Sequence, residues 1–296
     1  MSENDRIFES VIHEIGDVTV NNTSQFILSA VLCTIIAAFA IYGCYEWRKT
    51  GRPIALVLII AGAVTSSLEA ITDVIGHLFI FGDGAHVVFT LAGRPIPLWA
   101  FAAHIVAWSV VGYMGYWVVS RGGTAREVSI VGLIGTAGNL LLELPATNMG
   151  VYEYWGDQGL KAFGTFPIVW AFINMGGGVM AGALLGALPK KALHGWRVLS
   201  IIPLVPSAVI GFIWFSGWPF FVAINYQGET ITPNYWISTF GTVVSIVMAL
   251  VYTNMIARLL CSAPEPVAAR AQRTPGWRSL FTDSAALPRR RSATTT

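Results

Sequence analysis

Seven long apolar stretches restrict the fold of this chain more than any other feature. They cover about residues 25–47, 53–81, 96–120, 127–149, 166–188, 198–224 and 235–261. The hydrocarbon core of a bilayer is about 30 Å thick, and a helix needs about 20 apolar residues to cross it. Because lipid offers no partners for backbone hydrogen bonds, each stretch is predicted to be a helix. The sequence therefore predicts an all-α, polytopic membrane protein with a seven-transmembrane-helix bundle.

The composition supports this class. Charged residues make up 11% of the chain and hydrophobic residues 54%, and the mean hydropathy is +0.62. Soluble domains contain roughly 25% charged residues. The net charge of +2 implies no nucleic-acid partner. Cys33, Cys44 and Cys261 lie in or beside apolar stretches without CxxC spacing, so we interpret them as apolar filler.

The segments between the stretches alternate in charge. The first 24 residues carry five acidic residues against Arg6, whereas the loops "RKTGR", "RGGTAR" and "PKKALHGWR" are basic. Basic segments stay on the cytoplasmic side, so the N-terminus is predicted to lie outside and the C-terminus in the cytoplasm. The predicted parts are an extracytoplasmic segment 1–24, a transmembrane domain 25–262 in the cell membrane, and a basic, disordered cytoplasmic tail 263–296. The first span lacks the basic start of a signal peptide and is expected to be retained.

Ionisable residues interrupt the second stretch. In "SSLEAITDVIGHLFIF", residues 66–81, Glu69, Asp73 and His77 recur at every fourth position. On a helix this spacing places the three side chains along one narrow stripe. The sequence therefore predicts a polar stripe near the outer end of the second span.

Polar residues on three other spans are predicted to lie at a similar depth. They are His104 in the third span, Asn139 and Glu143 in the fourth, and Asn174 in the fifth. At 1.5 Å per residue, Glu143, like Glu69, lies ~24 Å from the cytoplasmic end of its helix. The inner halves of these spans are nearly pure Val, Ile, Leu, Gly and Ala. We therefore predict a polar site in the outer half of the bilayer.

Some of these residues have a purely structural alternative. A carboxylate within a span costs several kcal/mol unless it is paired or faces water, so Glu69 and Glu143 mark a functional cavity by default. Near a helix end, Asp73 and His77 could instead reach the interface. His104 could be a core histidine bonded to a neighbouring helix. Asparagine side chains within spans often form hydrogen bonds between helices, which is the structural alternative for Asn139 and Asn174.

The predicted chemistry is proton transfer. If both ionised, Glu69 and Asp73 would repel each other, so one is expected to stay protonated and act as a Brønsted acid. We assign Glu69 as the donor, Asp73 and Glu143 as partners or counter-charges, and His77 and His104 as proton shuttles.

An aromatic wall and a lid complete the predicted site. Aromatic faces stabilise cations at short range. The residues expected to bind substrate are Trp108, Tyr113, Asn139, Trp155, Trp170 and Asn174. The loop "NMGVYEYWGDQ" is predicted to cover the pocket, with Glu153 and Asp157 near its mouth.

Three segments carry a family resemblance: "SSLEAITD", "GRPIPLWAFAAHIVAW" and "ELPATNMGVYEYWGDQGLKAFGTFPIVWAFIN". With the seven short-looped spans, they resemble the small integral-membrane terpene cyclases of fungal meroterpenoid and indole-diterpene pathways and their bacterial counterparts. The resemblance implies cyclisation of a prenylated, hydrophobic substrate by protonation of an alkene or epoxide, without metal or cofactor. Glu69 matches the family's acid in the second helix. The family's acid in the last span has no counterpart here, so Glu143 or Asp73 would take that role.

Other functions remain open. The last span has no lysine for a retinal Schiff base and no HxxxH pair, although the acids and histidines could still bind a metal. The main alternative is a proton-coupled transporter or a lipid- or ligand-binding protein that uses Glu69, Asp73 and His77 as a proton relay. A transporter requires a polar lining or broken helices toward both sides. A third possibility is an assembly or scaffold subunit, in which the polar stripe binds a helix of a partner protein. Glu69 would then face lipid rather than the interior of the bundle.

Overall fold

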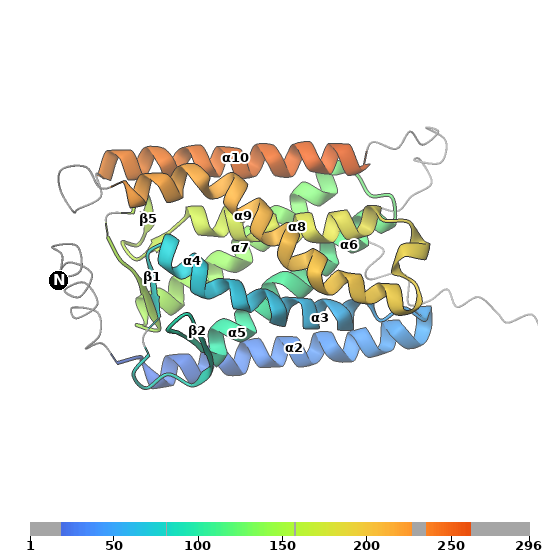
Figure 1. Cartoon of the computed structure of the whole chain (residues 1–296), viewed down its shortest axis with the longest axis horizontal. Coiled ribbons are helices and arrows are strands. Elements are labelled where there is room, and N and C mark those ends of the chain that lie inside the picture. The colour runs from blue at the N-terminus through green and yellow to red at the C-terminus, as the bar shows by residue number, and fades with distance from the viewer. Residues whose placement is uncertain (1–18, 81, 157, 227–234, 262–296) are drawn as a thin grey trace, which may run out of the picture.

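The structure is a computed structural model that describes residues 19–80, 82–156, 158–226 and 235–261. Most of the predicted N-terminal segment, the predicted cytoplasmic tail and Asp157 lie outside the described residues. Within these residues the fold is mostly helical, and seven helices are long and apolar enough to cross a membrane, which confirms the helical, apolar character predicted from the sequence. They run side by side along the long axis of the molecule (Figure 1). The described chain begins and ends at opposite ends of the bundle.

Four of the seven spans are single helices and three contain a change of helix type. The single helices are α2 (Asn22–Thr50), α7 (Ala125–Asn148), α8 (Val169–Ala187) and α10 (Tyr235–Cys261). The second span consists of α3 (Ile54–Thr65), the 3₁₀ turn η1 (Ser66–Leu68) and α4 (Glu69–Ile75). The third consists of α5 (Leu98–Ile105), the π-helix η2 (Val106–Val111) and α6 (Gly112–Ser120). The sixth begins with η4 (Gly195–Ser200), preceded by η3 (Lys190–Leu193), and continues as α9 (Ile201–Asn225).

Three small antiparallel strand pairs lie at one end of the bundle, which we call the hairpin end (Figure 1). They are β1 (Leu78–Ile80) with β4 (Tyr152–Tyr154), β2 (Val87–Leu91) with β3 (Arg94–Pro97), and β5 (Lys161–Ala162) with β6 (Phe166–Pro167). The hydropathy pattern does not predict these strands. The second span is predicted to extend to residue 81, whereas the helix ends at Ile75 and the chain turns into β1.

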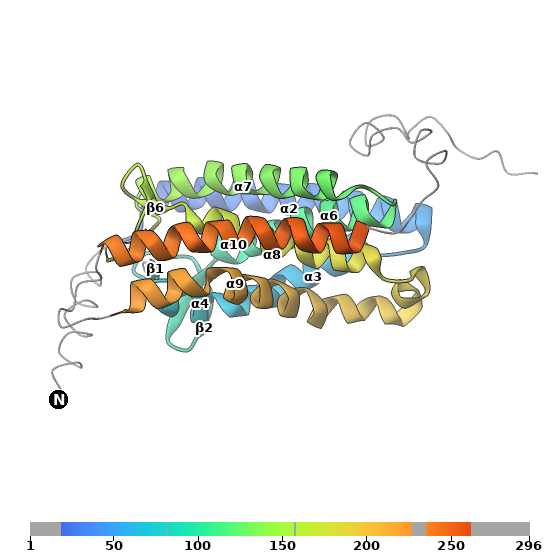
Figure 2. The same ribbon diagram turned by 90° about the horizontal axis from the view of Figure 1, so that it is seen from above.

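Helix α8 forms the centre of the bundle, between α6, α7, α9 and α10 (Figure 2). Its glycines bring neighbouring backbones unusually close. A Cβ added at Gly182 would collide with the carbonyl of Gly112, and one at Gly115 would lie 2.6 Å from the carbonyl oxygen of Val179. Small residues at such positions let helices pack by direct backbone contact. The small-residue stretch "NMGGGVMAG", residues 174–182, therefore serves helix packing.

Substitution of Gly182 by leucine is expected to destabilise the bundle. The side chain has no room between α8 and α6, and overpacking of this kind costs about 1–3 kcal/mol. Thermal unfolding of the detergent-solubilised protein measures the effect. Gly211→Leu is the matched control, because a Cβ at Gly211 meets nothing within 4 Å. Equal unfolding temperatures for the two variants would contradict the assigned helix contact.

Candidate functional site

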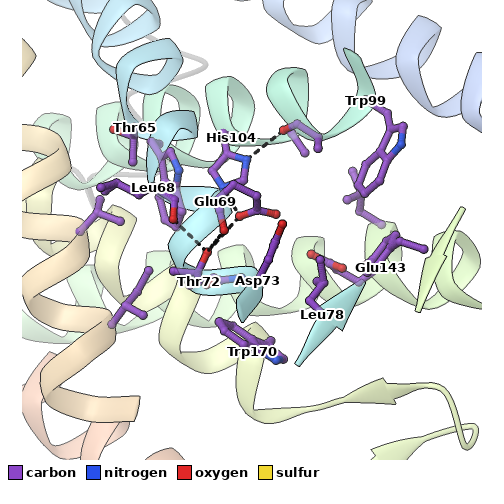
Figure 3. A pocket seen from close by; sticks show the side chains of 18 of the residues that line it. Thr65, Leu68, Glu69, Thr72, Asp73, Leu78, Trp99, His104, Glu143 and Trp170 are labelled. Carbon is purple, nitrogen blue, oxygen red and sulfur yellow. Dashed lines mark hydrogen bonds and ion pairs between the residues drawn. The ribbon is translucent and has the colours of Figure 1, made fainter. Parts of the chain in front are cut away.

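A small cavity of about 70 Å³ lies inside the bundle toward the hairpin end (Figure 3). Spans two to six, together with β1 and β4, supply its walls. Of the residues predicted from the sequence, it brings together Glu69, Asp73, His104, Trp108, Glu143, Trp170 and Asn174. These residues come from four different spans and are predicted to lie at a similar depth, and the structure places them around one cavity.

The centre of the cavity is an ion pair between the second and third spans. Glu69 Oε2 lies 3.0 Å from His104 Nε2, and both side chains are largely buried. On the far side of the ring, Nδ1 lies 2.9 Å from the carbonyl oxygen of Ala100 and must donate to it, because a carbonyl only accepts. The 3.0 Å contact therefore contains one proton, which either Glu69 or His104 carries. Glu69 also accepts a hydrogen bond from the Thr72 hydroxyl at 3.2 Å.

Departures from regular α-helix geometry place Glu69 and His104 next to each other. Glu69 begins α4 directly after the 3₁₀ turn, and His104 is the last residue but one of α5, where the π-helix follows. A glycine permits the two spans to approach, since a Cβ at Gly62 would lie 3.0 Å from the Cα of Ile105. The sequence places both residues on helices, but the pairing depends on this close helix crossing.

Two further carboxyl groups face the cavity. Asp73 is one turn beyond Glu69, is 2% exposed, and within the described residues its Oδ2 has no hydrogen-bond partner. Glu143 enters from α7 and accepts from Asn139 Nδ2 at 3.3 Å. Negative charges that share one cavity repel each other in a low-dielectric interior, so a proton bound to one of these carboxyl groups stabilises the cluster.

Aromatic side chains make up much of the wall. Trp99, Trp108 and Trp170 are each at most 5% exposed, and within the described residues their indole N–H groups have no hydrogen-bond partner. Tyr152 and Tyr154 reach the cavity from β4, and Tyr152 stacks on Trp99 with ring centroids 4.9 Å apart. Burial, and to a lesser extent the nearby carboxylates, raise the pKa of Tyr154 well above its usual range.

The two tyrosines were not among the predicted site residues. Tyr152 and Tyr154 alternate with the exposed Glu153, and in a strand residues two apart point to the same face. This alternation is the signal in the sequence that could have assigned them to the wall. Their strand belongs to the segment predicted to cover the pocket, and both tyrosines line the cavity.

His77 is not part of the cavity wall, which corrects the predicted stripe. Helix α4 ends at Ile75, and His77 adopts a left-handed backbone with φ 51°. Gly76 before it has no space for a side chain, because a Cβ there would collide with the Trp170 ring. The His77 ring instead stacks on Trp155, with centroids 4.0 Å apart, and its Nε2 lies 3.1 Å from Asn225 Oδ1. Trp155 is likewise absent from the cavity wall.

Tyr113 lies farther along the third span, away from this cavity, which corrects its predicted role. Its hydroxyl donates to Glu46 Oε1 at 2.7 Å and lies 2.9 Å from the Tyr42 hydroxyl. The sequence around Tyr113 is apolar and does not indicate that Glu46, in the first span, is its hydrogen-bond partner. We call Tyr42, Glu46 and Tyr113 the second polar cluster.

A larger pocket of about 310 Å³ adjoins the small cavity. The two share His104, Trp108, Glu143 and Asn174, and the larger pocket also includes Asn139. Its remaining lining is apolar and comes from α2, the π-helix and its flanks, α7 and α8. We call it the lateral pocket. Both predicted asparagines therefore line the lateral pocket, and Asn174 also lines the small cavity.

Comparison with protein-family models, curated proteins and solved structures finds no match. The chemistry of the site is therefore interpreted from its own geometry. Within the described residues, no group of three or more histidine, cysteine, aspartate or glutamate side chains is arranged to hold a metal ion.

The segment predicted as a lid packs against Gly76, His77 and β1. Strand β1 pairs with β4, and Gln158 Nε2 donates to the carbonyl oxygens of Gly76, His77 and Trp155. Burial lowers the pKa of His77 below its usual 6.5, so the packed arrangement favours the neutral ring. Protonation of His77 is therefore expected to weaken the packing of β1, β4 and Trp155 around it.

The packing around His77 is expected to weaken as the pH falls below about 6.5. A histidine whose pKa is depressed by burial disfavours the packed state once the pH is below its free pKa. Hydrogen exchange of residues 152–156, corrected for intrinsic rates, should be faster at low pH. His77→Phe keeps the ring stack on Trp155 without a titrating group, so its exchange should not depend on pH. Equal pH dependence in both proteins would contradict this role.

Proposed function

We propose that this chain is an integral-membrane terpene cyclase, which protonates an isoprenoid chain and guides its cyclisation without metal or cofactor. The observation that supports this most directly is the junction of the two cavities at Glu143 and His104. An apolar chain in the lateral pocket would meet an acid–histidine pair at its end. The family resemblance of the sequence leads to the same reaction.

In the proposed reaction Glu69 adds its proton to one carbon of an alkene, or to the oxygen of an epoxide. A carbocation forms, a second double bond of the chain attacks it, and a new carbon–carbon bond closes the ring. Loss of a proton from a neighbouring carbon to Asp73 or Glu143 leaves an alkene, so substrate and product are isomers. That proton then passes from the accepting acid through His104, 3.0 Å from Glu69, back to Glu69, which restores the starting state.

The aromatic wall would protect the carbocation. Trp99, Trp108 and Trp170 surround the acids, and the face of an aromatic ring stabilises a nearby cation by about 0.5–2 kcal/mol. Burial also excludes water, which would otherwise capture the cation before ring closure. A site of buried acids with tryptophan walls therefore suits cation chemistry better than hydrolysis.

The proposed orientation follows from the loop charges. With the N-terminus outside, the hairpin end faces outward and the site lies in the outer half of the cell membrane. The partners are then the lipid bilayer and a hydrophobic, prenylated substrate that dissolves in it.

A proton-coupled transporter or ligand-binding protein is the alternative, and the second polar cluster favours it. Glu46 with Tyr42 and Tyr113 supplies polar groups on the other side of the π-helix from the Glu69–His104 pair. Helix breaks beside a protonatable pair are typical of transport pathways. Proton flux into liposomes that accompanies substrate uptake, without any isomeric product, would support this function instead.

Glu69→Gln should abolish cyclisation while the protein stays folded. Loss of a general acid typically lowers a rate by about 100- to 10,000-fold. Membranes that carry each protein are incubated with farnesylated and geranylgeranylated small molecules, epoxidised and not, in the presence of EDTA, and products are identified by mass spectrometry. Glu153→Gln is the matched control, because Glu153 is exposed on the lid. An isomeric product that survives Glu69→Gln would exclude Glu69 as the donor.

A further inference from the structure

The lateral pocket opens between helices toward the outer surface of the bundle. Ile35 of α2 and Ile134 of α7 line it and are 38% and 53% exposed, so they stand at its outer edge. Both helices lie at the periphery of the bundle, with little of either buried inside it. In a membrane this surface contacts lipid, so the opening faces the hydrocarbon core.

The pocket leads from this opening to the acids. Six residues line both the lateral pocket and the small cavity: Ala103, His104, Trp108, Leu142, Glu143 and Asn174. One turn of α7 separates Asn139 from Glu143, and the two side chains are hydrogen-bonded. The lateral pocket therefore reaches from the lipid-facing edge to His104 and Glu143, which also line the small cavity.

The distribution of polarity along this path defines the ligand. The polar side chains of the lateral pocket, His104, Asn139, Glu143 and Asn174, gather at its inner end. The outer part is lined by aliphatic side chains, methionines and glycine, including Ile35, Val111 and Met114. Its volume of about 310 Å³ is at the lower end of small-molecule sites, roughly 300–1,000 Å³. These features suit one apolar chain with its reactive end at the acids.

We infer that α2 and α7 frame a lateral entrance through which an isoprenoid chain passes from the bilayer into the site. Its apolar tail occupies the lateral pocket, and its reactive end lies between Glu143 and the Glu69–His104 pair. The identity of the chain as an isoprenoid rests on the proposed function. The entrance itself rests on the shape and polarity of the pocket.

Gly138 provides a way to close this path without disturbing the bundle. It lines the lateral pocket on α7, and a Cβ added there meets nothing within 4 Å. A phenylalanine at this position would project into the space that the chain requires. Gly211 on α9 has the same open surroundings but lines neither cavity, so Gly211→Phe is a matched control.

The test is photolabelling of the full-length protein in phosphatidylcholine nanodiscs with a diazirine derivative of geranylgeraniol. Labelled peptides are mapped by mass spectrometry, with and without excess geranylgeraniol. In the wild type, competable labelling should concentrate in residues 103–114 and 134–143. Gly138→Phe should lower it by about tenfold or more, because the apolar contacts that hold the chain are lost, while Gly211→Phe should match the wild type.

Two results would overturn the inference. One is wild-type labelling that excess geranylgeraniol does not reduce, or that is spread evenly over the lipid-facing helices. The other is Gly138→Phe with undiminished labelling. Ile35→Trp narrows the entrance from the α2 side and should also reduce labelling. If Gly138→Phe has a lower unfolding temperature than Gly211→Phe, Ile35→Trp replaces it in the test, and undiminished labelling of Ile35→Trp then overturns the inference.

This experiment separates the entrance from the proposed reaction. Glu69→Gln leaves the lateral pocket open and should keep the wild-type labelling pattern. Competable labelling that Gly138→Phe removes, in a protein that forms no isomeric product, would retain the entrance and reject the cyclase. Isomeric product from a protein whose labelling is insensitive to Gly138→Phe would retain the cyclase and reject the entrance.

Discussion

The contact between Glu69 and His104 joins two spans at the places where both depart from a regular α-helix. The 3₁₀ turn η1 ends immediately before Glu69, and the π-helix η2 begins two residues after His104. An ionisable side chain within a span costs several kcal/mol unless it has a partner, and each of these residues supplies the other's. Short π-helical segments frequently occur at functional sites. The cavity, its additional acids and its tryptophan wall are arranged around this pair.

Close packing elsewhere determines where the cavity can be. Helix α8 presents glycines and alanines to its neighbours, so backbones meet and leave little free volume around much of its length. Toward the hairpin end, large buried side chains such as Trp170 and Phe166 take the place of these small residues, and Tyr152 and Tyr154 of β4 line the cavity. A pocket enclosed in this way is reached most directly from the side. This explains why the lateral pocket, rather than the end of the bundle, provides the route to the acids.

The two cavities differ in a way that suits a ligand with two different ends. The small cavity holds Glu69, Asp73 and three tryptophan rings, whereas the outer part of the lateral pocket is apolar. A hydrophobic chain gains free energy along the lateral pocket, and a polarisable double bond gains from the acids and rings. Transport and catalysis would both use the same proton pair, and the aromatic faces around it are what the proposed cyclisation requires for its carbocation.

The sequence by itself determined the membrane class, the seven spans and the depth of the polar residues, because length and hydropathy depend on the solvent rather than on contacts. It therefore located Glu69, Asp73, His104 and Glu143 in one layer. Tertiary structure decided which of them meet. A helix repeat predicts His77 on the stripe, but the space occupied by the Trp170 ring admits only glycine at position 76, where the helix ends and the chain turns away. Pairing between spans, such as Glu69 with His104, depends on helix crossings that no local pattern encodes.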